Sequence, residues 1–320
     1  MPTTTGCPSS TRTAALPWIA LGVVYLVWGS TYLGIRFLIE SAPAMLASGA
    51  RFVGAGLILA AIVAIVAGPG ALRFTRPQLV TAALVGLLLP GWGQGLVTVA
   101  EHHVSSGLTA LLVACMPLYV VLLRRILGER PPRVTLLGVS LGLCGLGVLV
   151  LAGAEGGSAG VTGNAWWGPW LVLLAVLGWA LGSVASTRLP TPPNPFGLAA
   201  VEMMIGGTAL AGAGLLAGER WELGATSTSS WISWGYLLVF GSLLAFSSYI
   251  YVLGQLPVST VATYAYVNPV IAVMLGMLLA GERFSLVQLG GGLLVLLAVV
   301  LVVRAEQRSR GIPAPEGAAR

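Results

Sequence analysis

Long apolar stretches separated by short polar segments run through the chain, and their spacing predicts the architecture. Ten runs have about 20 mostly apolar residues, the length that spans a bilayer as a helix. Segments rich in Gly, Pro, Ser, Thr and charged residues separate them, such as RLPTPPNP at 188–195. The pattern therefore predicts an all-α integral membrane protein with ten transmembrane helices. These helices should begin near Trp18, Ala44, Leu79, Ser106, Val134, Trp166, Phe196, Trp231, Val258 and Leu286.

The composition agrees with a membrane protein. The 320 residues are 57% hydrophobic and 8% charged, with a mean hydropathy of +0.92. A soluble domain has about 25% charged residues, so this chain could not cover a water-facing surface. A net charge of +6 would favour nucleic acid in a soluble protein. Here the arginines flank the apolar runs, so we expect the lipid bilayer as a partner and no nucleic acid.

The placement of arginines predicts the orientation. With ten spans both termini lie on one side, and most arginines fall in the segments on that side. Positive residues favour the cytoplasm, so both termini should be cytoplasmic. The sequence Ala42-Pro43-Ala44 weakly resembles a signal-peptide cleavage site. The apolar stretch before it is too long for a signal peptide, so we expect the first span to be retained.

The second half of the chain repeats the first. Pro117 matches Pro269, and Gly128-Glu129-Arg130 matches Gly281-Glu282-Arg283 after one single-residue gap. Because each half has five helices, an odd number, the second copy enters the membrane inverted, as in many transporters. A duplicated scaffold without transport activity is the alternative. The predicted units are an N-terminal tail (1–16), a first repeat (17–152), a connecting loop (153–165), a second repeat (166–303) and a C-terminal tail (304–320).

Several stretches carry a resemblance to a known family. They are WGSTYLGIR (28–36), GARFVGAG (49–56), VTVAEH (97–102), WALGS (179–183) and YAYVNPV (264–270). With the paired halves, they resemble the EamA-type transporters of the drug/metabolite transporter superfamily, and within it the YedA-type bacterial inner-membrane exporters. The resemblance implies a multi-pass protein of a bacterial inner membrane that exports its cargo. It also implies that helices one to four and six to nine surround a central cavity, with five and ten behind.

The stretch YAYVNP is polar for a lipid-facing helix and predicts a cavity wall. Pro269 has no N–H and frees the carbonyl of Ala265, and the neighbouring Asn268 offers donors and acceptors at that point. Pro117 holds the matching position, so we expect Pro117 and Pro269 to act as hinges. Tyr264 and Tyr266, two residues apart, should point to different faces of the helix.

Other aromatic and polar residues are candidates for the same cavity. Trp28 and Trp179 occupy equivalent places in the two halves, deeper than tryptophans that anchor a helix at the interface. Ser247 and Tyr251 lie one helical turn apart in the eighth helix. Gln94 lies in PGWGQG, whose proline and glycines should loosen the third helix beside a cavity.

Charged residues inside the predicted spans are the strongest functional candidates, since such groups are unfavourable in a bilayer. Arg51 and Glu202 occupy matching positions in the two repeats, about 10 Å deep from opposite sides. That separation favours two roles over one ion pair. Arg51 could hold an anionic group or a backbone carbonyl, and Glu202 could carry a proton or bind a cation. A local structural hydrogen bond is the alternative for each.

Glu101, His102 and His103 end the third span. Adjacent residues of a helix cannot both face one ion, so no metal site is expected. A proton-sensitive outer gate formed by Glu101 and His102 is one interpretation, since histidine titrates near neutral pH. A solvated helix end is the other.

Together these features predict a secondary transporter that moves a small amphipathic metabolite or drug by alternating access. The phosphate-binding motif GxxxxGK[ST] cannot occur because the chain has no lysine. We expect no enzyme activity and no cofactor. A sensory or structural membrane protein, or an intramembrane enzyme, are the alternatives. Cargo, direction, homodimer formation and proton coupling, for which Glu202 is the first candidate, stay open.

Overall fold

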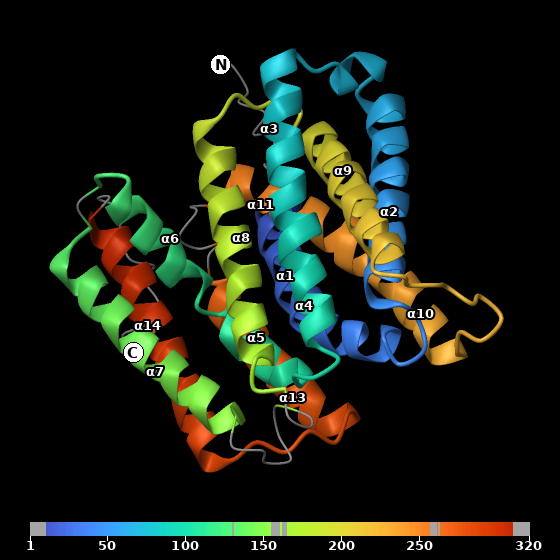
Figure 1. Ribbon diagram of the computed structural model, residues 1–320. Coiled ribbons are helices and arrows are strands. Elements are labelled where there is room, and N and C mark those ends of the chain that lie inside the picture. The colour runs from blue at the N-terminus through green and yellow to red at the C-terminus, as the bar shows by residue number, and fades with distance from the viewer. Residues whose placement is uncertain are drawn as a thin grey trace, which may run out of the picture.

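The protein is a bundle of helices (Figure 1). The computed structural model describes residues 11–129, 131–154, 161, 165–256, 261 and 263–309. In the first half the helical segments are α1 (Thr11–Leu38), α2 (Ala44–Val66), η1 (Pro69–Leu72), α3 (Arg76–Gly86), η2 (Leu87–Gln94), α4 (Gly95–Ala100), α5 (Ser106–Val113), α6 (Met116–Ile126) and α7 (Arg133–Ala154). In the second half they are α8 (Gly168–Arg188), α9 (Pro195–Leu216), α10 (Thr228–Tyr236), η3 (Leu237–Leu244), α11 (Ala245–Gln255), α13 (Tyr264–Leu279) and α14 (Leu286–Ser309). The predicted start of the ninth span at Val258, most of the connecting loop and both chain ends lie outside the described residues.

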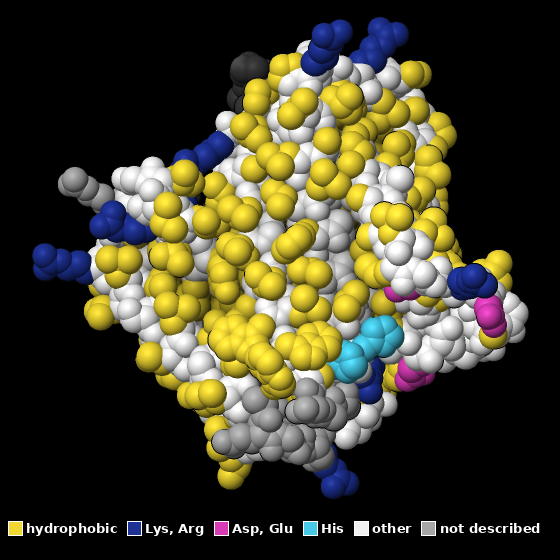
Figure 2. All heavy atoms as spheres, viewed as in Figure 1, with side chains coloured by type: hydrophobic (Ala, Val, Ile, Leu, Met, Phe, Trp, Pro, Cys, Tyr) yellow, Lys and Arg dark blue, Asp and Glu magenta, His cyan; other side chains and the backbone are white. Residues whose placement is uncertain are grey.

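Consecutive helical segments join into spans that match the predicted ones in number and order; α3, η2 and α4, for example, form the span Arg76–Ala100. In the described residues nine such spans are long and apolar enough to cross a membrane, and α13 adds an apolar helix of 16 residues. Large apolar side chains point outward along the bundle, including Leu216 at 92% and Leu286 at 87% exposure. They cover most of the face in Figure 2, while charged side chains lie at its borders. So large an exposed apolar surface fits lipid rather than water.

The two matched prolines have different effects on their helices. In the fourth span α5 ends at Val113 and α6 starts at Met116, so the helix breaks just before Pro117. Pro117 lies in the first turn of α6, where a missing N–H is tolerated. Helix α13 instead continues through Pro269. The structure thus shows an interrupted helix at one of the two positions only.

Glycines bring α9 into backbone contact with two neighbours. A Cβ atom added to Gly207 would lie 2.8 Å from the Gly49 carbonyl oxygen of α2. One added to Gly206 would lie 2.1 Å from the Gly86 carbonyl oxygen of α3. Small residues allow such close approach between membrane helices. Figure 1 shows α2 and α9 side by side.

Helices α7 and α14 pair with each other at one side of the bundle (Figure 1). A Cβ on Gly145 would lie 3.0 Å from the Gly291 carbonyl oxygen, and one on Gly138 would lie 2.7 Å from Val302. These contacts leave the other eight spans to surround the centre of the molecule.

The contact at Gly206 predicts a destabilised variant. In Gly206→Ala the new methyl group overlaps Gly86 and Pro90, so the helices must move apart. Such overpacking lowers the free energy of unfolding by about 1–3 kcal/mol. Gly212→Ala is the matched control on the same helix, because no atom lies within 4 Å of a Cβ there. Thermal unfolding in detergent checks this, and equal melting of the two variants would contradict the packing described.

Candidate functional site

A cavity lies among the eight spans other than α7 and α14. Its empty space is about 1200 Å³, including the part open to solvent. Most of the wall is apolar or aromatic, with a few polar side chains pointing in. The polar and charged side chains of the wall are Thr31, Tyr32, Arg51, Gln94, Glu202, Ser242, Tyr264 and Asn268. Concave, mostly apolar sites with a few convergent polar groups are typical of small-molecule binding.

Wider π-helical turns line this cavity at equivalent places in the two halves. Segment η2 interrupts the third span, and η3 interrupts the eighth. Such turns often mark functional sites. Each lies against a tryptophan of the other half. The Trp28 indole N–H donates to the Gly241 carbonyl of η3 (3.3 Å), and a Cβ on Gly93 of η2 would lie 2.9 Å from the Trp179 ring.

Aromatic rings from three helices meet at one side of the cavity. The Trp28 ring centroid is 5.0 Å from that of Tyr249 and 5.4 Å from that of Tyr264. Tyr249 and Tyr264 are 5.8 Å apart and nearly perpendicular. Edge-to-face contacts of this kind stabilise aromatic clusters. The predicted residues Trp28, Trp179 and Tyr264 are therefore all at the cavity.

Three predicted residues are not among those that line the cavity: Ser247, Tyr251 and Tyr266. Tyr251 packs in the cluster around Ala20 and Val24, and Tyr266 packs against the core formed with α5, α7 and α14. In the eighth span the cavity face instead carries Gly241, Ser242 and Phe246. The π-helical turns of η3 shift which residues face inward, so a regular helical period selects the wrong face.

Arg51 and Glu202 both line the cavity and are buried, at 3% and 6% exposure. Arg51 Nε and Glu202 Oε1 have no hydrogen-bond partner among the described residues. The Arg51 guanidinium lies 4.2 Å from the centre of the Phe52 ring. Buried polar atoms without partners are uncommon in proteins and need an explanation.

The packing of α2 on α9 sets how far Arg51 and Glu202 are offset along the helix pair. The helices are antiparallel, with Gly49 facing the turn between Gly207 and Ala211 and Gly56 facing the turn between Ala200 and Met204. Arg51 is therefore displaced along the helix pair from Glu202 by roughly five residues, or about 7.5 Å at 1.5 Å per residue. No ion pair joins these two described side chains, and the separate roles expected for them stay a prediction.

The Asn268 amide connects α13 to α1. With its nitrogen facing the carbonyls, Asn268 donates to Tyr25 O (3.2 Å) and Tyr264 O (3.3 Å). It does not bond the carbonyl of Ala265 that Pro269 frees, which was the expected partner. Gln94 lines the cavity from η2, where its Oε1 is buried without a partner among the described residues.

We expect Asn268→Ala to reduce stability rather than to act on cargo alone. The change removes two buried hydrogen bonds, one to Tyr25 of α1 and one to Tyr264 within α13, which lowers the free energy of unfolding by about 1–3 kcal/mol. Gln255→Ala, at the exposed end of α11, is the control and should melt like the native chain. If Asn268→Ala also melts like the native chain, the amide does not hold the two helices together.

Glutamates cap two helix N-termini at one end of the bundle. LLAGER occurs at 215–220 and again at 278–283, and Gly218 and Gly281 have positive φ of 83° and 65°, which ends each helix. Glu219 then accepts from the backbone N–H groups at the start of α2, and Glu282 from those at the start of α5. A helix N-terminus favours a carboxylate. The copy at 215–220 was missed, although the repeated letters would have revealed it.

The predicted outer-gate residues lie at this same end. Glu101 is fully buried at the end of α4, while His102 is exposed. The His103 ring packs edge-on against Trp167, with ring centroids 4.9 Å apart. Among the described residues no three His, Cys, Asp or Glu side chains come together as metal ligands.

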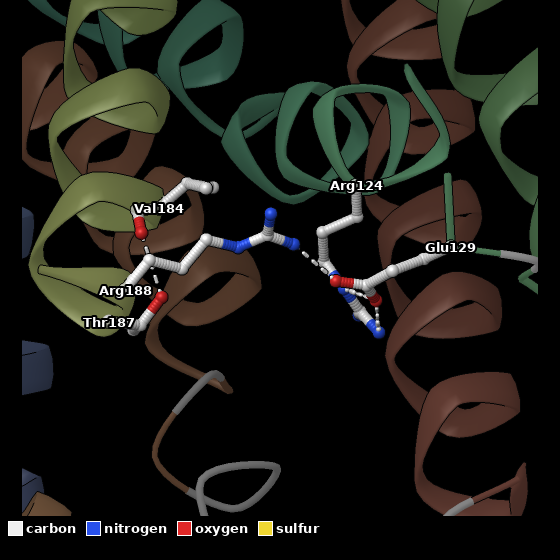
Figure 3. A network of polar contacts seen from close by, with 5 residues as sticks. All are labelled: Arg124, Glu129, Val184, Thr187 and Arg188. Atoms are coloured by element: carbon white, nitrogen blue, oxygen red, sulfur yellow. Dashed lines mark hydrogen bonds and ion pairs between the residues drawn. The ribbon is translucent and has the colours of Figure 1, made fainter. Parts of the chain in front are cut away.

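Glu129 behaves differently at the other end of the bundle. Its carboxylate accepts from Arg124 (2.6 Å) and from Arg188 (2.6 Å), which joins the end of α6 to the end of α8 (Figure 3). The hydrogen bond from Arg124, and then that from Arg188, holds the pKa of Glu129 below its usual range. The depressed pKa means that the pairing is present at neutral pH and is lost only as the pH falls below the usual carboxyl range.

Comparisons with known proteins agree with this architecture. The EamA-like transporter family model matches residues 16–151 and again residues 166–304. The chain is 38% identical over 284 residues to the uncharacterized inner membrane transporter YedA of Escherichia coli (strain K12), which covers 88% of this chain and 89% of YedA. It is 28% identical over 287 residues to a probable terminal-alkyne amino-acid exporter of Streptantibioticus cattleyicolor, with 89% and 92% of the two chains covered.

A solved crystal structure has the same fold. It superposes with a TM-score of 0.60 at 19% identity and covers 94% of this chain and 99% of its own. The paired family matches, the ten apolar helices and the cavity between the halves lead to one assignment. The chain belongs to the EamA-like transporter family, whose fold is two five-helix repeats.

Proposed function

We propose that this protein is a secondary transporter of a small zwitterion, an amino acid with an apolar side chain. One observation carries the proposal: Arg51 and Glu202 line the same apolar cavity with buried atoms that lack partners. A cargo with one negative and one positive group would satisfy both. The name of the amino-acid exporter from Streptantibioticus cattleyicolor supports the same class.

The chemistry of the two side chains favours a carboxylate and an ammonium group. A guanidinium binds a carboxylate through two parallel hydrogen bonds, and a carboxylate accepts from an ammonium group. Transfer of either cargo charge into an apolar cavity is unfavourable unless it is paired. The offset of about 7.5 Å between Arg51 and Glu202 leaves room for one small molecule between them.

The aromatic wall would receive the apolar side chain of the cargo. Trp28, Trp179, Phe52 and Phe246 all contribute to it. Aromatic rings offer large apolar area and prefer edge-to-face or offset contact with other rings. The proposed cargo therefore has an aromatic or branched aliphatic side chain.

Alternating access is the proposed mechanism. The inverted halves place equivalent π-helical segments, η2 and η3, at the cavity wall, so either half could move against the other around one site. The two ends also differ in this conformation. At one end Glu219 and Glu282 cap helices, while at the other Glu129 binds two arginines.

The arginine distribution and the names of two relatives support a location and a direction of transport. The arginine distribution favours cytoplasmic termini, and YedA is named an inner membrane transporter. We assign this chain to the bacterial inner membrane with its Glu101 end outside. Export rests on the name of the amino-acid exporter.

A thermal-shift comparison of three matched ligands tests the cargo class. Phenylalanine has both charges, phenethylamine lacks the carboxylate, and 3-phenylpropionate lacks the ammonium group. At 100 times its Kd a ligand stabilises by about 2.7 kcal/mol, so phenylalanine should raise the melting temperature and the two analogues should not. An equal shift with phenethylamine would contradict the proposal and indicate a carrier of cationic drugs.

A further inference from the structure

Glu282 caps the N-terminus of α5 at one end of the bundle, and we call this contact the Glu282 cap. Its carboxylate accepts from the Ser106 backbone N–H (2.7 Å), the Ser106 hydroxyl (2.8 Å) and the Gly107 N–H (3.0 Å). The carboxylate fits a notch between glycines, since a Cβ on Gly276 would lie 2.5 Å from Oε2 and one on Gly107 would lie 3.1 Å from it. These contacts tie the loop after α13 to the start of α5. Three donors and a helix N-terminus stabilise negative charge on this carboxylate.

Glu101 lies close to this cap and has no partner for its charge. It follows the last residue of the span Arg76–Ala100 and is 0% exposed. Neither of its carboxylate oxygens has a hydrogen-bond partner among the described residues. Arg36 donates to the backbone carbonyl of Glu101 (3.0 Å), and no ion pair forms with the carboxylate. A buried, unpaired carboxylate is strongly unfavourable in its ionised form.

The ionisable groups around Glu101 come from three elements. Arg36 from α1, Arg51 from α2 and Glu282 from the loop after α13 act on it, and the Tyr32 hydroxyl of α1 is also near. Burial raises the pKa of Glu101 well above its usual range, and the negative charge of Glu282 raises it further. The positive charges of Arg36 and Arg51 lower the pKa of Glu101, but by less than burial and Glu282 raise it. The neutral acid is thus the form that fits beside a closed cap.

We propose that Glu101 is a proton-binding site that is occupied while the Glu282 cap is formed and is emptied when that end of the bundle opens. In the closed form a solvent proton is bound to one carboxylate oxygen. On opening, water reaches the group, the O–H bond breaks, the proton passes to water and the carboxylate remains. The cargo would be bound elsewhere, because Glu101 is not among the cavity residues. The inference rests on the proposed transport cycle for its opening step, and it replaces Glu202 as the proton carrier.

The sign of the pH dependence follows from this difference between the two forms. The closed form holds the proton more tightly than the open form, so a rise in pH favours the open form. Glu101→Gln mimics the protonated acid at every pH. It should therefore keep the end closed and remove the pH dependence.

Infrared spectroscopy of the purified protein without cargo tests the proton directly. The test uses the Glu202→Gln background, which removes the other buried carboxylate without a full set of partners. At about pH 7 this protein should show a C=O stretching band of a protonated carboxyl that is absent when Glu101→Gln is added and retained when Glu222→Gln, at an exposed glutamate, is added instead. The band should be lost as the pH is raised. An identical band in Glu101→Gln at every pH would overturn the proposal. Because no cargo is present, this result is independent of the thermal-shift test of the cargo class.

Cysteine labelling tests the link to opening. The three native cysteines are first replaced. Thr109, which is buried in α5 behind the Glu282 cap, is then changed to cysteine. Ala225→Cys, made separately in the same background, is the exposed control at the same end of the bundle. The ratio of labelling rates at 109 and 225 should rise with pH, by up to about tenfold per unit for release of one proton. Addition of Glu101→Gln should make this ratio independent of pH. The same rise in the presence of Glu101→Gln would overturn the proposal.

Discussion

Replacement of Glu202 or Arg51 with glutamine should abolish the binding of a zwitterionic cargo while the chain stays folded. Each change removes one partner of a buried, charged hydrogen bond to the cargo. That loss is about 2–5 kcal/mol, or roughly 30-fold to 4,000-fold in Kd. Calorimetric titration with phenylalanine measures it. The Kd of Arg51→Lys should lie between those of the native chain and Arg51→Gln, because an ammonium group keeps the charge but not the two parallel hydrogen bonds.

The stability of the empty protein separates binding from folding in these variants. Glu202 Oε1 has no partner among the described residues, so Glu202→Gln should not lower the melting temperature without cargo. Glu222→Gln is the exposed control and should leave both affinity and melting unchanged. Native affinity in both cavity variants would show that neither charge touches the cargo.

Removal of the Trp179 ring should weaken aromatic cargo selectively. Trp179 lies on the cavity wall against Gly93, so a cargo side chain could pack on its ring. In Trp179→Ala the affinity for phenylalanine should fall by about 1–3 kcal/mol through lost apolar and aromatic contact. The affinity for alanine should change little, since its methyl group is too small to use that wall. Competition binding with the two amino acids gives the ratio.

Trp170→Ala is the matched control on the same helix. Trp170 is 52% exposed near the start of α8 and is not among the cavity residues. It should leave the ratio of the two affinities unchanged. An equal loss for phenylalanine and alanine in Trp179→Ala would mean that the ring supports the fold of the site rather than the cargo side chain.

The spans and their order were predictable because the physics behind them is local. A bilayer requires about 20 apolar residues for each span, and the chain shows this directly. Pro117 likewise predicted a weak point, and α5 and α6 are separated there. The resemblance implied that the fifth and tenth spans lie behind the others, and α7 and α14 do pack together there, with Gly145 against Gly291.

The cavity was predictable only where the helix period is regular. Arg51 and Glu202 lie on regular helices, and both side chains line the cavity. In the third span, Pro90 and the neighbouring glycines predicted an irregular helix. The eighth span did not, because LLVFGSLL has no proline and a single glycine. Its π-helical turns shift the inward face, so Ser242 and Phe246 were missed and Ser247 and Tyr251 were chosen.

The roles of the acidic residues at the ends depend on contacts between distant segments. Glu282 caps a helix that starts at residue 106, and Glu219 caps one that starts at residue 44. No local pattern reveals such partners. The equivalent Glu129 instead binds Arg124 and Arg188, so repeat symmetry alone would have assigned it the wrong contacts.

Exchange transport in proteoliposomes tests the central claim most directly. Vesicles that contain the purified protein and unlabelled phenylalanine should take up labelled phenylalanine in a saturable manner. Leucine should compete, phenethylamine and 3-phenylpropionate should not, and Glu202→Gln and Arg51→Gln should reduce uptake to that of protein-free vesicles. Uptake equal to protein-free vesicles for the native chain, or equal uptake by the native chain and both variants, would contradict the assignment of this cavity to a zwitterionic cargo.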